Sequence, residues 1–261
     1  MTTSRPTVAV VIPCFGRGEF LGEAIESALE QTRRPDEIVV VDDGSPDGLR
    51  SVVEPYEVEG VGYLRQPNGG PGAARNTGVS GCRSEFVVFL DADDRLDPRY
   101  QERTLAFLQE APPAVGYAYT QCRYFGAAEG TSHFPPFSAK RLLRDNIVHV
   151  SALLRTELVR RFPFDESLRD GLEDWDLYLT LAEHGIGGVL CDEPLLWYRK
   201  HGNGSRNDEL EASGRSGEDL AHRIQRRHWR VGGPLLAARV ELWYLRRHAS
   251  SALAQARRGQ R

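Results

Sequence analysis

The chain has 261 residues, which is enough to bury a sizeable core and suits one large domain, or one domain with an appendage. Its net charge of −4 is uneven: ten arginines against two carboxylates give residues 219–261 a charge of +8, which leaves −12 for the first 218 residues. So acidic a body argues against a broad nucleic-acid-binding face, and we expect no nucleic-acid partner.

The four cysteines are widely scattered, at Cys14, Cys82, Cys122 and Cys191. They lack the paired spacing of a metal site or of a small secreted disulfide framework, so we expect reduced thiols. No signal-peptide pattern precedes the first expected strand, and no apolar run approaches the roughly 18 residues of a membrane span. These features together predict a cytoplasmic protein.

Four apolar runs alternate with helical patterns in the first 110 residues. Strands are expected at residues 7–13, 37–41, 61–65 and 85–90, and helices over 20–29, shortly after 48, over 72–79 and over 99–110. This alternation predicts right-handed crossovers and a parallel sheet. Ligands of such a sheet bind at the carboxyl ends of its strands.

The fourth strand ends abruptly in carboxylates. In an extended chain alternate side chains share a side, so Asp91 and Asp93 should point together and Asp94 should point away. Two convergent carboxylates suit a hard divalent cation that takes further ligands from water and substrate phosphates. The stretch therefore predicts a metal-bound phosphorylated donor, although an acidic turn leading into the next helix would have the same composition.

A dinucleotide-binding loop is an alternative for the first strand. Gly16, Gly18 and Gly22 loosely resemble the glycine fingerprint of that fold, and the acids after the second strand lie roughly where its ribose-binding acid falls. Against it, Pro13 lies in the turn, the third glycine is one place late, and the acids at Asp91 and beyond go unexplained. We therefore keep an NAD-dependent oxidoreductase as the minor alternative.

After residue 110 the pattern changes to that of a mixed sheet. Strands are expected at 115–125, 147–154 and 189–198, with helices within 132–145, at 156–161 and at 173–181. His149 is expected to be structural rather than a ligand. Glu173 and Asp174 open the last of these helices, where the helix dipole favours carboxylates. His201, followed by glycines, could cover a site as a mobile segment, and polar residues 207–218 are expected to be disordered or ordered only by substrate.

The basic tail is expected to form two helices broken at residues 232–234. Its second helix carries apolar residues among arginines, a character that fits an anionic membrane surface. It fits equally a helix docked on the acidic body or on a second subunit. We favour docking. The alternatives are dimerisation through these helices and peripheral membrane contact, and the latter would place the protein at the inner face of the membrane.

Several motifs occur in a fixed order between residues 8 and 205. They are Ile12-Pro13-Cys14-Phe15-Gly16-Arg17, Asp42-Asp43-Gly44-Ser45, Asn68 to Gly78, Leu90-Asp91-Ala92-Asp93-Asp94, Glu173-Asp174 and Tyr198-Arg199-Lys200-His201. In this order they resemble the family 2 glycosyltransferases of the GT-A fold, although Gly16 replaces the usual Asn.

The resemblance implies an α/β fold of GT-A type, with a mostly parallel central sheet flanked by helices. Residues 1–218 would form the glycosyltransferase domain, with a Rossmann-like nucleotide-sugar-binding half at about 7–110 and a mixed-sheet acceptor half at 111–206. Residues 219–261 would form a basic C-terminal helical extension.

The resemblance also implies the site residues. Those expected to bind the nucleoside-diphosphate sugar are Pro13, Phe15, Arg17, Asp43, Arg75, Asp91 and Glu173, with Asp43 on the base. Mn²⁺ or Mg²⁺ would be held by Asp93 and Asp91, with His201 either completing the metal shell or clamping the diphosphate. Asp174 would be the catalytic base, since an acceptor hydroxyl needs one on the opposite face of the sugar.

These expectations describe an inverting enzyme that moves one sugar from a uridine or thymidine diphosphate donor to a hydroxyl of a glycan, a lipid-linked sugar or a small molecule. Polymerising relatives carry Gln-x-x-Arg-Trp and membrane spans, whereas this chain has His228 at the Arg position and no span, so a single transfer is favoured. A catalytically inactive sugar-nucleotide-binding protein is the remaining alternative.

Overall fold

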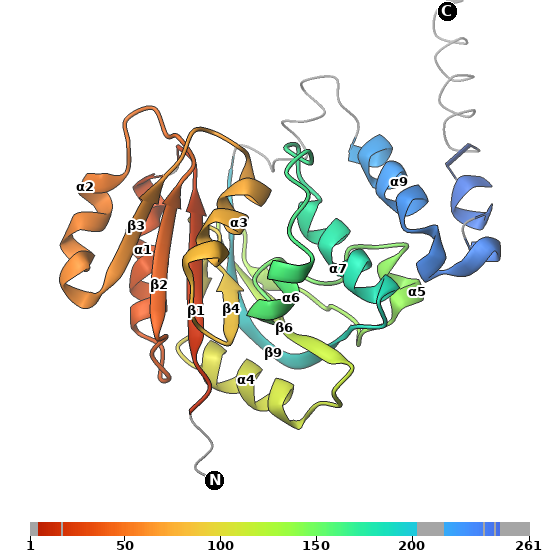
Figure 1. Cartoon of the computed structure of the whole chain (residues 1–261), viewed down its shortest axis with the longest axis horizontal. Helices are drawn as coiled ribbons and strands as arrows, with labels where there is room; N and C mark the ends of the chain where they lie inside the picture. Colours follow the sequence, from red (N-terminus) through yellow and green to blue (C-terminus); the bar gives the residue numbers. More distant parts are fainter. Residues whose placement is uncertain (1–4, 17, 203–216, 237, 243, 246–261) are drawn as a thin grey trace, which may run out of the picture.

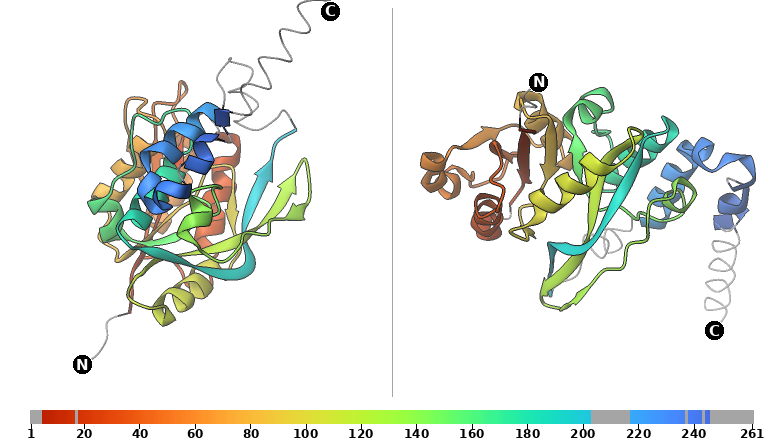
Figure 2. Two further views of the ribbon diagram at one scale, coloured as in Figure 1. Left: turned by 90° about the vertical axis from the view of Figure 1, so that its right-hand side faces the viewer. Right: turned by 90° about the horizontal axis from the view of Figure 1, so that it is seen from below.

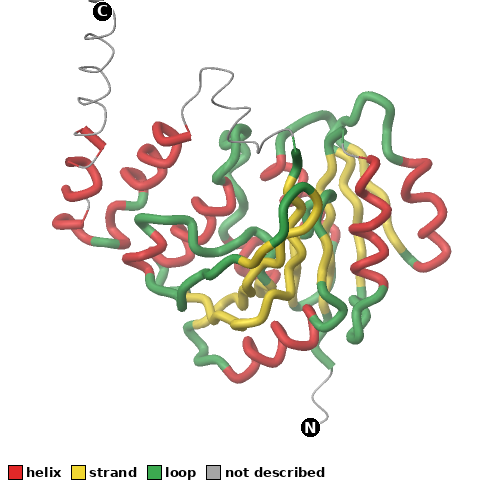
Figure 3. The backbone as a smooth tube through the Cα atoms, turned by 180° about the vertical axis from the view of Figure 1, so that it is seen from behind, coloured by secondary structure: helices red, strands yellow, loops and turns green. Residues whose placement is uncertain are grey.

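The computed structural model describes residues 5–16, 18–202, 217–236, 238–242 and 244–245 (Figure 1). Arg17 and most of the polar segment 207–218 lie outside the described residues. The described strands form one nine-stranded sheet in the order β3-β2-β1-β4-β8-β6-β9-β5, with β7 paired to β6. Figure 3 shows the strands gathered in the middle of the molecule with helices around them.

The first half is a parallel α/β unit, as expected. Its strands are β1 (Val8–Cys14), β2 (Glu37–Asp42), β3 (Val61–Arg65) and β4 (Phe86–Phe89), and its helices are α1 (Gly18–Leu29), α2 (Arg50–Val53), η1 (Glu54–Glu59), α3 (Pro71–Gly81) and α4 (Tyr100–Glu110). Strand β1 pairs in parallel with both β2 and β4 and is buried along its whole length. A continuous apolar run predicts this central position.

The second half is a mixed sheet. It contains β5 (Arg95–Leu96), β6 (Val115–Gly126), β7 (Gly130–Thr131), β8 (Leu153–Arg155) and β9 (Gly187–Lys200), with α5 (Ala139–Leu142), α6 (Thr156–Arg161) and α7 (Glu173–Glu183). Strand β8 is antiparallel to β4 and β6, whereas β6 and β9 are parallel.

The expected strand over residues 147–154 is mostly wrong. Only its end is extended, because His149 organises a turn: its Nδ1 accepts a hydrogen bond from Ser151 N at 3.2 Å, and its carbonyl accepts one from Ala152 N at 3.2 Å. Such local bonds compete with strand pairing.

The sheet separates two apolar cores. Val10 and Ile12 of β1 lie in the core with α1 and α4, whereas Ala9 and Val11 lie in the core with α3 and α7. Helix α3 approaches β1 closely at Gly78, where an added Cβ would overlap with the Val11 side chain. The glycine therefore sets how near to the sheet α3, and with it Arg75, can lie.

The C-terminal segment packs at the end of the molecule opposite α2 (Figure 2). It comprises α9 (Gly217–Arg227), η2 (Trp229–Val231) and further helical residues at 233–236, 238–242 and 244–245. Leu220 and Ile224 are buried in the same core as α7, which docks α9 on the body. Within the part of the chain that the structure describes, no helix is both long and apolar enough to cross a bilayer.

Candidate active site

A cavity of about 600 Å³ opens beyond the carboxyl end of β4 and is bounded by the first turn of α7. Ligand sites of open α/β sheets lie at this edge. Its polar lining comes from segments far apart in the chain, and includes Arg75, Asp91, Asn146, His149, Glu173, Asp174, Tyr198 and Lys200.

Arg75 joins two acidic motifs across this cavity. Its guanidinium is buried and donates to Asp91 Oδ1 at 2.8 Å and to Glu173 Oε1. Burial alone would lower the pKa of Arg75, but the two carboxylates raise it above its ordinary value, so Arg75 stays protonated and positively charged. Arg75 thus fixes the residue that ends β4 against the residue that opens α7.

The chain after β4 is a turn and not an extended strand. Asp94 N donates to Asp91 O at 3.0 Å, so the expectation that Asp91 and Asp93 share a side because the chain is extended is wrong. The Asp91 and Asp93 side chains are partly exposed, whereas Asp94 is buried. Burial, and then repulsion from Asp91 and Asp93, raises the pKa of Asp94 well above its usual value.

The end of β9 is fastened to the same turn. Arg199 N donates to Asp94 Oδ1 and Arg199 Nε donates to Asp93 O, both at 2.8 Å. Two residues later, His201 Nε2 lies 2.8 Å from Asp93 Oδ2. The structure therefore brings together Asp93 and His201, which are 108 residues apart.

The acidic turn fits a divalent cation in its donor chemistry. Oxygen and imidazole ligands suit Mn²⁺, and the crowded carboxylates at the turn favour a positive charge there. Among the residues that the structure describes, however, no three His, Cys, Asp or Glu side chains converge as a finished metal site. Asp91 is engaged by Arg75, so a cation here would need further ligands from a phosphorylated donor and water.

Asp174 lies at the opposite wall, in the first turn of α7. Its Oδ1 accepts from Trp175 N at 2.7 Å and its Oδ2 accepts from Asn146 Nδ2 at 3.2 Å. Burial, and then the neighbouring Glu173 carboxylate, raises the pKa of Asp174 well above its ordinary value despite the opposing effect of Arg75. A carboxylate held in this state accepts a proton more readily than an ordinary aspartate.

The turn that leads into α7 is strained. Leu172 has φ 63° and is the only residue other than glycine with positive φ in the described part of the chain. A left-handed backbone conformation is energetically unfavourable for a residue with a branched side chain, and it persists only where the surrounding structure holds the residue in place. Here the strain sets the start of α7, with Glu173 and Asp174 facing the cavity.

The nucleotide side of the site is built on Asp43. Its Oδ1 accepts from Gln66 Nε2 and Gly69 N at 2.7 and 2.8 Å, and its Oδ2 accepts from Gly70 N at 2.8 Å. Gly70 has φ 91°, which explains the glycine there. Asp43 therefore holds the loop before α3, and its expected bond to a nucleotide base stays a prediction.

Three other residues of this half, Pro13, Phe15 and Arg17, were expected to bind the nucleotide-sugar donor. Pro13 is buried at the end of β1, Phe15 is 52% exposed just beyond it, and Arg17 is outside the described residues. Asp42, by contrast, is structural, because its carboxylate accepts from Tyr63 OH at 2.7 Å and from Arg65 Nη1 at 3.0 Å.

Two side chains near Asp174 complete the description. Sequence analysis missed Asn146, which lies in an irregular segment with no periodicity to mark it and whose Oδ1 has no hydrogen-bond partner among the described residues. His149 is structural, as expected, and burial lowers its pKa to about 4, so its ring is neutral at pH 7.

Comparison with known proteins gives consistent matches. The model of the family described as Glycosyl transferase family 2 matches residues 9–165. The uncharacterized glycosyltransferase RT0329 of Rickettsia typhi is 34% identical over 221 residues, which cover 80% of this chain and 68% of that protein. The uncharacterized glycosyltransferase EpsJ of Bacillus subtilis is 29% identical over 219 residues, which cover 76% of this chain and 62% of EpsJ.

Two solved structures share the fold. TarS of S. aureus in complex with UDP-GlcNAc matches with a TM-score of 0.69 and 21% identity, covering 85% of this chain and 65% of the TarS fragment. The mannosyltransferase PcManGT from Pyrobaculum calidifontis, in complex with GDP-Man and Mn²⁺, matches with a TM-score of 0.60 and 21% identity over 96% of this chain and 81% of that chain. The GT-A architecture expected from the sequence is confirmed.

The chain is shorter than several of its relatives. It spans 62% of EpsJ and 31% of a glycosyltransferase from Rickettsia felis. The shared part is thus only a portion of those proteins.

Proposed function

Because the chain belongs to glycosyl transferase family 2, we propose that it moves a single sugar from a nucleoside-diphosphate sugar to an acceptor hydroxyl, with inversion at the anomeric carbon. The Arg75 bridge carries the proposal, since it fixes the acidic turn after β4 against the first turn of α7. A donor whose diphosphate lies at the acidic turn would present its sugar to Asp174 within one cavity. Membership of this family removes the NAD-dependent oxidoreductase alternative.

Asp93 and His201, with Asp91, would hold Mn²⁺ or Mg²⁺ together with the donor diphosphate. Such a cation offsets the charge that develops on the leaving diphosphate. The grouping of Asp91, Asp93 and Asp94 at the turn supports this assignment, as does the Mn²⁺ present in the complex of PcManGT, which shares the fold. With a donor present, His201 would complete the cation's ligands or contact the diphosphate.

Asp174 would serve as the general base. As the acceptor oxygen forms its bond to the anomeric carbon and the bond from that carbon to the diphosphate breaks, the hydroxyl proton passes to the Asp174 carboxylate. Asn146 orients this carboxylate through its 3.2 Å hydrogen bond. The raised pKa of Asp174 supports this assignment, because it strengthens the base.

Glu173 and the β1–α1 loop would bind the donor. Glu173 is buried and its Oε2 has no hydrogen-bond partner among the described residues, so it is available to a sugar hydroxyl. The exposed Phe15 ring at the end of β1 offers a surface for the nucleotide base. Pro13 and Arg17 would flank it, and Asp43 would bond the base or hold the loop that does.

The acceptor would be a hydroxyl of a glycan, a lipid-linked sugar or a small molecule. Transfer of one sugar is favoured over polymerisation because the residue at the Arg position of the polymerase motif is structural here. His228 is buried, with its Nε2 2.8 Å from Asp176 Oδ1. We assign residues 1–218 to transfer and residues 219–261 to a basic extension.

Thermal denaturation in the presence of nucleotides tests the donor assignment. UDP, TDP and GDP would each be added with Mn²⁺ and with a chelator, because a ligand that binds only the folded state raises the melting temperature. We expect one nucleoside diphosphate to stabilise the protein only when Mn²⁺ is present. Stabilisation by NAD without metal, or by no nucleotide at all, would contradict the proposal.

A second assay separates an enzyme from an inactive binding protein. The donor that stabilises the protein would be incubated with pools of glycans, lipid-linked sugars and small hydroxyl compounds while release of nucleoside diphosphate is measured. Acceptor-dependent release is expected. Tight metal-dependent binding with no release in any pool would instead support the inactive alternative.

A further inference from the structure

The described helical residues between 233 and 245 have two apolar faces, and one of them is docked. Leu236 packs against the core that contains α7. Tyr244 stacks on His222 with ring centroids 3.6 Å apart, and its hydroxyl donates to Asp219 Oδ1 at 2.6 Å. These contacts hold this part of the tail against α9.

The second face is exposed. Leu235, Leu242 and Leu245 are 84%, 48% and 54% exposed. Their spacings of seven and three residues place them on one side of a helix, and Arg239 lies on the same side, four residues after Leu235. Packing against the body therefore does not explain why leucines occupy these three exposed positions.

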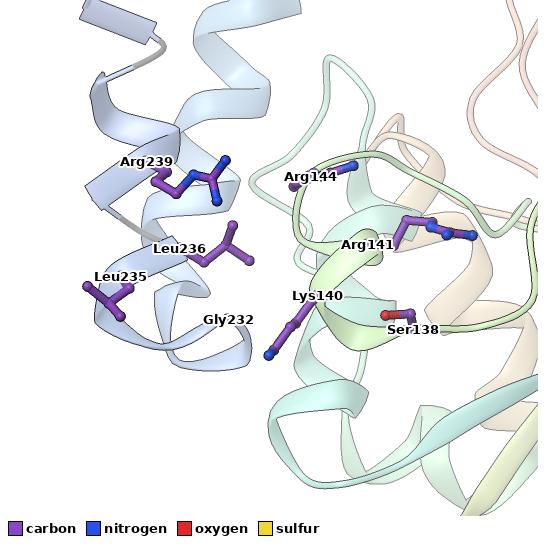
Figure 4. Close-up of a pocket in the computed structure, with 8 residues that line it drawn as sticks. All are labelled: Ser138, Lys140, Arg141, Arg144, Gly232, Leu235, Leu236 and Arg239. Atoms are coloured by element: carbon purple, nitrogen blue, oxygen red, sulfur yellow. The ribbon is translucent and has the colours of Figure 1, made fainter.

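A basic cavity of about 470 Å³ lies beside the exposed face, between the tail and α5 (Figure 4). Its cations are Lys140, Arg141, Arg144 and Arg239, and no acidic side chain lines it. Across the described residues, no ion pair joins these four cations to a carboxylate. Guanidinium groups bind phosphate oxygens in bidentate fashion, so the cavity suits a phosphate group.

The cavity depends on a close approach of the tail to the body. An added Cβ at Gly232 would come within 2.7 Å of Leu143 Cδ2 and 2.6 Å of Leu236 Cδ2. The glycine lets the turn between η2 and the last helical residues lie this near the end of α5 without displacing these two leucine side chains. The position of Arg239 opposite Lys140 and Arg144 is therefore set by the fold.

We propose that this surface, made of the exposed leucines and the basic cavity, binds the face of an anionic lipid bilayer. A lipid phosphate would enter the cavity while Leu235 and its neighbours enter the interface, which is the arrangement of helices that lie in a membrane surface. Charge would orient the protein on such a bilayer, because the first 218 residues carry −12 and would be repelled by the anionic face, whereas this end of the molecule is basic. The proposal does not depend on which sugar or acceptor the cavity at α7 takes.

Vesicle flotation of the full chain tests the proposal. Vesicles of phosphatidylcholine alone would be compared with vesicles that also contain phosphatidylglycerol, at low and high salt. We expect binding only to the anionic vesicles and its loss in high salt. Replacing Lys140, Arg141 and Arg144 together by Ala should lower partitioning roughly a hundredfold, because each basic residue near such a surface contributes about a fivefold factor.

Two further variants separate apolar insertion from charge. Leu235→Ser should also lose vesicle binding, whereas Val58→Ser should keep it, since Val58 is 90% exposed on η1 at the other end of the molecule. Equal binding to neutral and anionic vesicles, or full binding by the triple variant, would overturn the proposal. Concentration-dependent self-association that Leu235→Ser abolishes would also overturn it, because the surface would then join two copies. Binding of inorganic diphosphate without binding to vesicles would overturn it as well.

Discussion

Replacing Arg75 with Met should cost stability as well as activity. Arg75 is 4% exposed and bonds Glu173, which is itself 7% exposed, so the variant leaves a buried carboxylate without its partner. Removing one member of a buried pair typically costs about 3–5 kcal/mol. We expect a loss of that size in the free energy of unfolding, measured by urea denaturation at pH 7.

The chain offers a matched control and a double-variant cycle for this test. Arg34 forms a comparable pair with Glu59 at 3.3 Å, but both side chains are about half exposed, so Arg34→Met should cost less than about 1 kcal/mol. Adding Glu173→Gln to Arg75→Met should recover part of the loss, with a coupling energy of about 1–3 kcal/mol. A loss for Arg75→Met no larger than that for Arg34→Met, or a coupling energy of zero, would refute the bridge.

Three further outcomes are expected. Asp93→Asn should abolish Mn²⁺-dependent donor binding, measured by calorimetric titration. The control Glu110→Gln, at the exposed end of α4, should leave this binding unchanged. If the two variants bound the donor with equal affinity in the presence of Mn²⁺, Asp93 would not belong to the metal site. Asp43→Ala should weaken nucleoside diphosphate and sugar nucleotide alike, by about 1–3 kcal/mol, and unchanged affinities would count against it. The raised pKa means that the folded protein holds the Asp174 proton more tightly than the unfolded chain does. Ionisation of Asp174 therefore destabilises the folded wild type as pH rises. Relative to wild type, Asp174→Asn should become more stable from about pH 4 upward. A stability difference that does not change with pH would show that this carboxyl is not perturbed.

The parallel half of the fold was predictable because its signal is local. Runs that are buried on both faces, such as β1, stand out in the sequence, and β3 begins and ends at the residues predicted for it. In the second half, α6 likewise matches its predicted bounds. The turn at residues 91–94 and the turn at His149 were not predictable in this way. There, single hydrogen bonds to backbone groups decide the conformation, and no periodic pattern records them.

The acidic positions of the site were predicted, but not what holds them. Arg75 and Glu173 are 98 residues apart, and Asn146 and Asp174 are 28 apart, so neither pair leaves a local pattern. In the structure Arg75 bonds Asp91 and Glu173, and its expected contact with the donor stays a prediction. Burial and long-range contact determine such roles, and both require the fold.

Turnover by Asp174→Asn tests the central claim most directly. Asn keeps the size, its Oδ1 can still accept from Trp175 N, and its amide can donate to the unpartnered Asn146 Oδ1 once that side chain flips, so the fold should hold. Donor affinity should be nearly unchanged while kcat falls by roughly 10²–10⁴-fold, because the variant cannot accept the hydroxyl proton. Turnover near the wild-type rate in Asp174→Asn, with Glu173→Gln inactive, would assign the base to Glu173 and contradict this account.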